Sequence, residues 1–134
     1  MTEPHLIRLN GPWEMTIDAQ GEPTRVKLPA AWPQIFQAAS GGAVVLKRWF
    51  HRPTGIDDGS QVQLQLVDLP FQGSAWINGA SLGEFPALQK HIVDVKSHLI
   101  MRCCLTISIK TLAPLEKTIP TPQISLAILP AHPT

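Results

Sequence analysis

The sequence predicts an all-β fold, a β-sandwich, and three observations lead to that prediction. Short segments of alternating or β-branched residues recur about every 8–12 residues. Thirteen prolines and nine glycines divide the chain between these segments. Helical periodicity is weak throughout. A length of 134 residues, 44% of them hydrophobic, is most simply one globular domain that covers residues 1–134.

Eight segments are predicted to be strands, and residues 61–69 give the clearest pattern. Val62, Leu64 and Leu66 alternate with glutamines, so one face of this strand is expected to be buried and the other solvated. Residues 104–110 repeat that alternation. The predicted strands cover residues 13–18, 25–28, 44–50, 61–69, 74–78, 91–95, 104–110 and 124–129.

Helical structure is expected at two places. Residues 30–40 are predicted to form one or two turns, because Pro33 limits where a helix can begin. Residues 94–99 are predicted to form a single turn with Asp94 as its cap. Two surface loops are expected where proline or glycine gathers, at residues 52–60 and 111–123.

Residues 79–83, Gly-Ala-Ser-Leu-Gly, match the G-x-S-x-G pattern of a hydrolase nucleophile elbow. That motif needs a strand, a sharp turn and a following helix, but the residues that follow here, EFPALQK, have no helical period. Asn78-Gly79 is instead a hairpin pair, because both central residues of a type I′ turn have positive φ. The segment therefore predicts a hairpin, and a hydrolase that uses Ser81 ranks third among the functional hypotheses.

The charge balance and the hydropathy pattern exclude several classes of partner. Nucleic-acid binding needs a basic face, but the net charge is +1 and no cluster of lysines or arginines occurs along the sequence. No window is apolar enough for a spanning helix, and residues 1–13 lack the apolar core of a signal peptide. We therefore expect a cytoplasmic protein that binds neither nucleic acid nor membranes.

Cysteine and histidine usage gives no sign of a redox or metal centre. Cys103 and Cys104 are adjacent, and neighbours on a strand face opposite sides, so two free thiols are expected. The five histidines lack metal-ligand spacing, and no glycine-rich nucleotide motif is present. The sequence therefore predicts no metal and no cofactor.

Five short motifs stand in order between residues 10 and 110. They are Asn10-Gly11-Pro12-Trp13, Leu28-Pro29-Ala30-Ala31-Trp32, Lys47-Arg48-Trp49-Phe50-His51-Arg52-Pro53, Ala75-Trp76-Ile77-Asn78-Gly79 followed by Leu82-Gly83, and Val93-Asp94-Val95 followed by Leu99. Together they resemble the N-terminal sugar-binding domain of the β-galactosidase and β-glucuronidase class (family 2) of glycoside hydrolases. The resemblance implies a jelly-roll β-sandwich of the galactose-binding-like type, here as a stand-alone domain.

The resemblance also implies that the chain is not an enzyme, because the catalytic carboxylates of that class lie in a later barrel domain. Two departures concern sugar contacts. Residues 115–123, LEKTIPTPQ, lack the Asp, Asn, aromatic and Gly residues of the corresponding loop, and Cys103 replaces an expected Asn. The resemblance therefore supports the fold more strongly than it supports the sugar contacts.

Trp49 and Arg48 are the first two candidate ligand-binding residues. Phe50 faces inward in the resembling motif, and neighbours on a strand face opposite ways, so Trp49 is expected to face outward and to stack on a sugar ring. Arg48, like Arg52, can donate two hydrogen bonds to a carboxylate or to paired hydroxyls. The alternative is a surface ion pair with an acid such as Asp57 or Asp58.

Asp94 and Phe71 are the other two candidates. By resemblance Asp94 approaches the sugar, whereas its position before a predicted turn favours a structural cap. Phe71 lies in the expected loop DLPFQGS, where an exposed aromatic ring suggests a binding edge. The remaining tryptophans, Trp13, Trp32 and Trp76, are expected to be buried.

These residues predict a non-catalytic carbohydrate-binding module. The alternative is a protein-interaction or assembly module that has lost sugar binding. In that alternative, Trp49 and Val45 form an apolar patch that buries against another protein or against a second copy in a homodimer.

Overall fold

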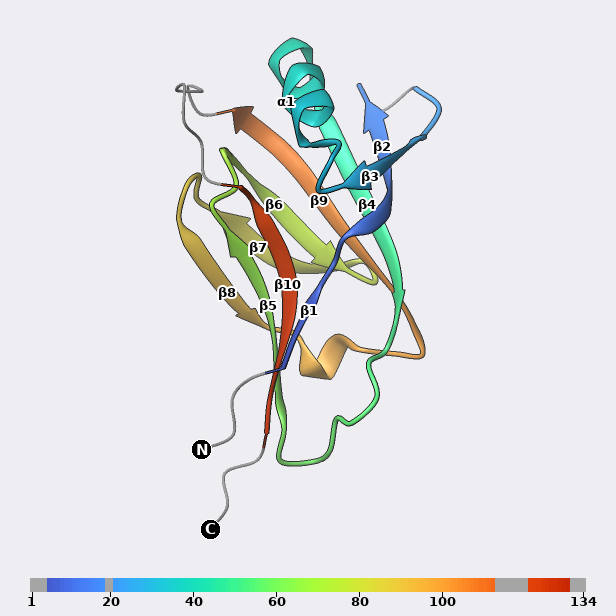
Figure 1. Ribbon diagram of the computed structural model, residues 1–134, viewed down its shortest axis with the longest axis vertical. Coiled ribbons are helices and arrows are strands. Elements are labelled where there is room, and N and C mark those ends of the chain that lie inside the picture. Colours follow the sequence, from blue (N-terminus) through green and yellow to red (C-terminus); the bar gives the residue numbers. More distant parts are fainter. Residues whose placement is uncertain (1–4, 19–20, 113–120, 131–134) are drawn as a thin grey trace.

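The computed structural model describes residues 5–18, 21–112 and 121–130, with the side chains of residues 111 and 112 excepted. Two antiparallel sheets face each other, as predicted for an all-β sandwich (Figure 1). The four-stranded sheet has the order β1 (His5–Arg8), β10 (Gln123–Leu129), β5 (Gln61–Val67) and β8 (Lys90–Asp94). The six-stranded sheet has the order β3 (Thr24–Leu28), β2 (Gly11–Ile17), β4 (Val44–His51), β9 (Arg102–Leu112), β6 (Phe71–Ile77) and β7 (Ala80–Phe85).

All eight predicted strand segments coincide with strands, whereas β1 and β7 were not predicted. Both missed strands are edge strands with several exposed residues, so they lack the buried alternation that identifies a central strand. Helix α1 (Trp32–Gly41) has ten residues and is longer than the predicted one or two turns. Pro33 lies in its first turn, where the missing N–H has no partner to lose, so it starts the helix without shortening it. No helix among the described residues is long and apolar enough to span a bilayer.

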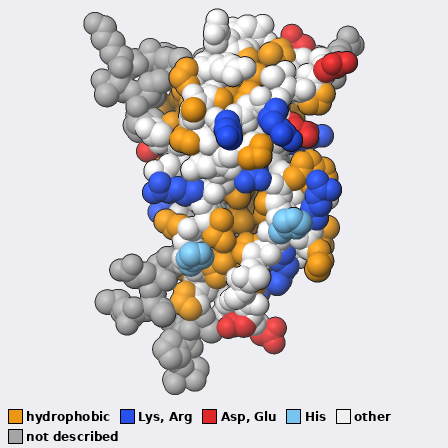
Figure 2. Space-filling view, turned by 45° about the vertical axis from the view of Figure 1, so that its right-hand side comes forward, with side chains coloured by type: hydrophobic (Ala, Val, Ile, Leu, Met, Phe, Trp, Pro, Cys, Tyr) orange, Lys and Arg blue, Asp and Glu red, His pale blue; other side chains and the backbone are white. Residues whose placement is uncertain are grey.

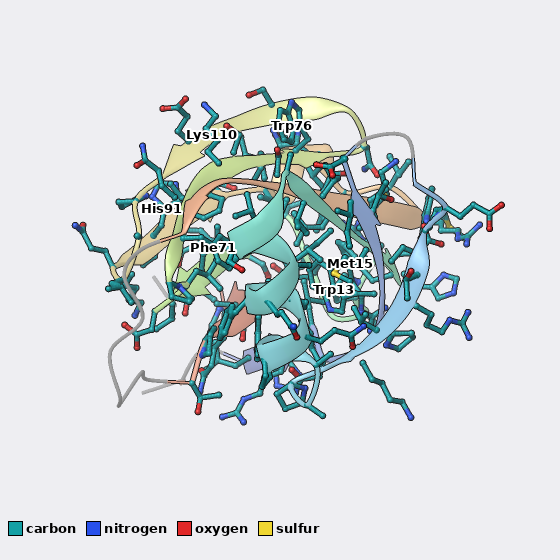
Figure 3. The ribbon with its side chains drawn as sticks, turned by 90° about the horizontal axis from the view of Figure 1, so that it is seen from above. Trp13, Met15, Phe71, Trp76, His91 and Lys110 are labelled. Carbon is teal, nitrogen blue, oxygen red and sulfur yellow. The ribbon has the colours of Figure 1, made fainter. Side chains whose placement is uncertain are left out.

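The core lies between the sheets, where inward residues of both meet. Phe71 is 0% exposed, and its ring centroid lies 6.3 Å from that of Trp32 and 6.0 Å from that of Phe85. The prediction of Phe71 as an exposed ligand-binding residue is therefore wrong, because the expected loop is the start of β6 and Phe71 points inward from it. Figure 3 shows Trp13 and Phe71 inside the sandwich and Trp76 on its outer side.

Two of the three tryptophans expected to be buried, Trp13 and Trp32, are buried. Trp76 is only partly buried, so the prediction for Trp76 is wrong. The reason is the strand alternation: Ala75 and Ile77 face the core, which leaves Trp76 on the outer face of the six-stranded sheet.

The chain crosses from one sheet to the other at Leu9 and Asn10, and the crossing is held by hydrogen bonds. The buried Trp13 Nε1–H donates to the Leu9 carbonyl at 2.8 Å. The Arg48 guanidinium donates to the Asn10 carbonyl through Nε at 3.1 Å and Nη2 at 2.8 Å. Gly11 follows with a φ of 85°, a conformation that favours glycine. The Asn10-to-Trp13 motif and Arg48 therefore stabilise the crossing between the two sheets.

The predicted hairpin at Asn78-Gly79 is present, and both residues have positive φ, 52° and 84°. The Asn78 side chain donates to the His98 carbonyl at 2.8 Å and accepts from the Cys104 N–H at 2.9 Å. The Ser81 hydroxyl accepts a hydrogen bond from the Gly83 N–H at 3.2 Å, which is a local turn contact. Within the described residues, no histidine or carboxylate bonds to this hydroxyl, so nothing there supports a nucleophile.

Residues 52–60 form a loop whose backbone carbonyls accept hydrogen bonds from one lysine, Lys96. Lys96, in the short 3-10 helix η1 (Lys96–His98), donates through Nζ to the carbonyls of Asp57, Asp58 and Ser60 at 2.7, 3.0 and 2.6 Å. The Asp57 carboxylate accepts from the Ser60 hydroxyl at 2.8 Å. These bonds anchor the far end of a loop that begins at Arg52.

The hydrogen bond from Ser60 lowers the pKa of Asp57 below its usual value of 3.8. A carboxyl with a depressed folded-state pKa stabilises the fold above its unfolded-state pKa, and that contribution is lost as the pH falls through the folded-state value. We expect the urea concentration at the unfolding midpoint to decrease as the pH is lowered below about 3.8. Asp57→Asn should make that decrease smaller. Asp58→Asn is the control, because the Asp58 carboxylate accepts no hydrogen bond within the described residues. An unchanged acid response in Asp57→Asn would contradict this assignment.

Candidate functional site

The exposed side chains of β4 form one wall of a groove on the outer face of the six-stranded sheet. Leu46 faces the core, while Lys47 is exposed and Trp49 is 42% exposed. The prediction that Trp49 faces outward is therefore confirmed. This Trp49 groove has a volume of about 180 Å³ and is lined by Pro12, Trp13, Glu14, Arg25, Lys47, Arg48, Trp49 and Arg102.

Strand register explains why residues so far apart in sequence meet in the groove. Glu14 on β2 lies opposite both Arg25 on β3 and Lys47 on β4. On the other side of β4, His51 pairs with Arg102 of β9. The Arg102 guanidinium carbon lies 4.5 Å from the Trp49 ring centroid, a cation–π contact that orients the indole.

The groove combines an aromatic face with hydrogen-bonding charges. Four cations, Arg25, Lys47, Arg48 and Arg102, line it together with the carboxylate of Glu14. A sugar presents a C–H face to an indole and hydroxyls to charged groups, so the groove has the chemistry for such a ligand. Glycoside cleavage needs two carboxyl groups, about 5–9.5 Å apart. Among its lining residues Glu14 is the single carboxylate.

A second hollow, the inter-sheet cleft, lies between the edge strand β1 and the end of β4. It has a volume of about 370 Å³ and is lined by His5, Ile7, Arg8, Leu9, Arg48, Phe50, His51, Arg52, Pro53, Thr54 and Leu126. Figure 2 shows this open side of the sandwich, where hydrophobic side chains occupy the middle and Lys, Arg and His side chains surround them.

The cleft is open because β4 is longer than its pairing with β2. β2 pairs with residues 44–47 of β4, while residues 48–51 continue past it beside the crossing at Asn10. Arg48 lines both hollows and so lies where they meet. Partial burial lowers the pKa of the Arg48 guanidinium, which remains a cation at neutral pH.

The structure brings two of the four predicted ligand residues, Trp49 and Arg48, to one site. Arg48 donates to the backbone carbonyls of Asn10 and Trp49, and not to an acid of the 52–60 loop as the alternative had it. Asp94 lines neither hollow. Its carboxylate accepts from the Lys96 N–H at 3.1 Å, a local turn contact, whereas the N-cap of η1 is Val95, one residue after the predicted cap. Phe71 is buried, and residues 115–120 of the expected sugar-contact loop lie outside the described residues.

Sequence reasoning missed most of the residues around Trp49. They are Glu14, Arg25, Lys47 and Arg102 in the groove, His5, Arg8 and His51 in the cleft, and Trp76 on the same sheet face. Alternation along β4 and β6 would have placed Lys47 and Trp76 outward. Nothing in the sequence pairs Arg25 or Arg102 with Trp49, because that proximity depends on which strands are neighbours.

No family model and no curated protein matches the chain. Solved structures do. A β-glucuronidase of an uncultured Clostridium sp. matches with a TM-score of 0.74 at 15% identity, covering 97% of this chain and 30% of that one. A Bifidobacterium dentium β-glucuronidase complexed with coumarin-3-O-glucuronide matches with a TM-score of 0.72 at 15% identity, with the same coverage.

A putative β-galactosidase from Bacteroides fragilis matches with a TM-score of 0.69 at 13% identity, covering 95% of this chain and 23% of that one. The chain has a jelly-roll sandwich fold found in family 2 glycoside hydrolases. This jelly-roll chain spans less than a third of the length of each of these three enzymes.

Proposed function

We propose that the protein is a non-catalytic carbohydrate-binding module and that the Trp49 groove is its binding site. The observation that carries the proposal is the half-exposed Trp49 ring, which Arg102 orients inside a groove lined with hydrogen-bonding charges. The structures with the same fold are named as glycosidases, and one of them holds a glucuronide. A shallow, preformed site of this kind binds weakly, with a Kd of about 10–1000 µM.

A second aromatic ring, that of Trp76, lies on the outer face of the six-stranded sheet, close enough to Trp49 for one oligosaccharide to contact both. Trp49 lies opposite Cys104, and Trp76 lies opposite Thr106, both on β9. Trp49 and Trp76 are thus two strands apart and offset by two residues, which places their backbones about 12 Å apart. An extended glycan that stacks on Trp49 can therefore reach Trp76, which supports an oligosaccharide as the ligand.

Trp49→Ala is expected to weaken glycan binding at least tenfold, about 1.4 kcal/mol, because it removes the stacking surface. A glycan array run on wild type and variant identifies the ligand, and titration calorimetry on the best glycan measures the change. Ile92→Ala is the matched control, since Ile92 is 45% exposed on β8 of the other sheet. Undiminished binding by Trp49→Ala, or a blank array from folded protein, would count against the proposal.

The second candidate function is a protein-interaction or assembly module. The Trp49 and Val45 patch is interrupted by the exposed Lys47, which lies between them on the same face. The specific observation that favours this candidate lies just before β9, where the adjacent Ile100 and Met101 are 58% and 85% exposed. A blank array together with a concentration-dependent dimer that Met101→Glu abolishes would favour assembly.

A further inference from the structure

All five arginines of the chain line the groove and the cleft. Arg8 and Arg52 lie in the cleft, Arg25 and Arg102 lie in the groove, and Arg48 lines both. With Lys47, the two hollows hold six permanent cations and one carboxylate, although the net charge of the whole chain is only +1. Positive charge is therefore concentrated on this side of the molecule.

The cleft in particular lacks a counter-charge. Its lining includes Arg8, Arg48 and Arg52, and no aspartate or glutamate is among its lining residues. A guanidinium carries five N–H donors. Arg48 uses three of them, two toward the Asn10 carbonyl and one toward the Trp49 carbonyl. Clustered cations with free donors repel one another, and a bound anion would offset that repulsion.

The cleft also has an apolar lining. Ile7, Leu9, Phe50 and Leu126 contribute it, between the charged side chains. A ligand that fits must therefore present apolar surface as well as anionic groups. The groove repeats this combination, with the Trp49 ring beside Arg25, Lys47 and Arg102.

We propose that the ligand is a polyanionic saccharide, one that carries repeated carboxylate or sulfate groups. This proposal rests on the proposed carbohydrate-binding function and specifies its ligand class. Sugar rings lie against Trp49 and against the apolar lining of the cleft, while the arginines on either side of Arg48 bind successive anionic groups. Two hollows that meet at one arginine can accept neighbouring units of a single chain.

Single-stranded nucleic acid is the competing polyanion. Proteins that bind it use rows of aromatic side chains on which successive bases stack. The groove has one exposed ring, Trp49, and the next ring on that sheet face, the half-buried Trp76, lies two strands away. Phe50 in the cleft is also partly buried, so these rings do not form a continuous row. The described geometry therefore favours the saccharide, and the nucleic acid is an outcome of the test.

The test compares four probes by titration calorimetry: a galacturonate tetrasaccharide, its fully methyl-esterified and uncharged form, a chondroitin sulfate tetrasaccharide, and a single-stranded DNA oligonucleotide. The variants are Arg8→Ala/Arg52→Ala in the cleft, Trp49→Ala in the groove, and Lys90→Ala as a control that removes one cation outside both hollows. Lys90 begins β8, which lies at the opposite edge of the four-stranded sheet from β1. Arg48 is left intact because it holds the sheet crossing.

We expect at least one charged tetrasaccharide to bind at least tenfold more tightly than the esterified one. Its affinity should decrease as the salt concentration is raised. Arg8→Ala/Arg52→Ala should weaken it at least fivefold and Lys90→Ala less than twofold. Equal binding of the charged and esterified forms, with sensitivity to Trp49→Ala alone, would overturn the polyanion proposal and leave the sugar-binding function standing. Binding of the oligonucleotide but of no saccharide would overturn both.

Discussion

Phe71→Ala is expected to lower the free energy of unfolding by about 3–5 kcal/mol, the cost of removing a fully buried aromatic ring. Phe71 is 0% exposed and packs against Trp32 and Phe85. The cavity would open between β6 and α1, where the neighbouring rings are too large to close it. The variant should bind glycans with unchanged affinity wherever it remains folded, because Phe71 lines neither hollow.

Urea denaturation followed by tryptophan fluorescence measures this loss. Ile92→Ala is the control, because it shortens an apolar side chain that is 45% exposed, and it should cost less than about 1 kcal/mol. A loss below about 1 kcal/mol in Phe71→Ala would mean that the ring is not part of the core.

Gly73→Ala is the second change with a large expected effect, a loss of about 3 kcal/mol or more. A Cβ built at Gly73 lies 2.2 Å from the Ser108 carbonyl oxygen and 2.9 Å from the Phe85 ring. The first neighbour is backbone of the paired strand β9 and cannot rotate away. The added methyl group must therefore separate β6 from β9 at the irregularity that the pairing already has between Gln72 and Gly73.

Gly41→Ala provides the matched control, since a Cβ there meets no heavy atom within 4 Å. Gly41 is the last residue of α1, where alanine is the better helix former, so the change should be within about 1 kcal/mol of wild type. Thermal unfolding of both variants by circular dichroism measures the difference. Similar melting temperatures for the two would contradict the close approach of β6 and β9.

The sequence was sufficient to predict the central strands and the sandwich because burial on one face imposes a period of two. β5 and β9 show this most clearly. The same alternation, extended three residues back from the predicted strand at 74–78, would have placed Phe71 inside. The expected loop begins with Asp68, Leu69 and Pro70. Because this segment indicates a turn, the start of β6 was not recognised as a strand.

The candidate site was far less predictable than the fold. Trp49 and Arg48 are neighbours in sequence, and strand alternation was enough to place the tryptophan outside. The arginines are scattered from Arg8 to Arg102, so no cluster is visible along the chain. Their proximity follows from the strand order and from the crossing at Asn10, which are properties of the tertiary structure.

The most direct test of ligand binding at the Trp49 groove is an NMR titration of the tryptophan indole N–H signals. The chain has four tryptophans, and Trp49→Phe assigns the signal of Trp49. On addition of the galacturonate or chondroitin sulfate tetrasaccharide, the Trp49 signal should shift, while that of the buried Trp32 should not. Saturable shifts elsewhere in the protein with an unmoved Trp49 indole would contradict the assignment of the groove as the binding site.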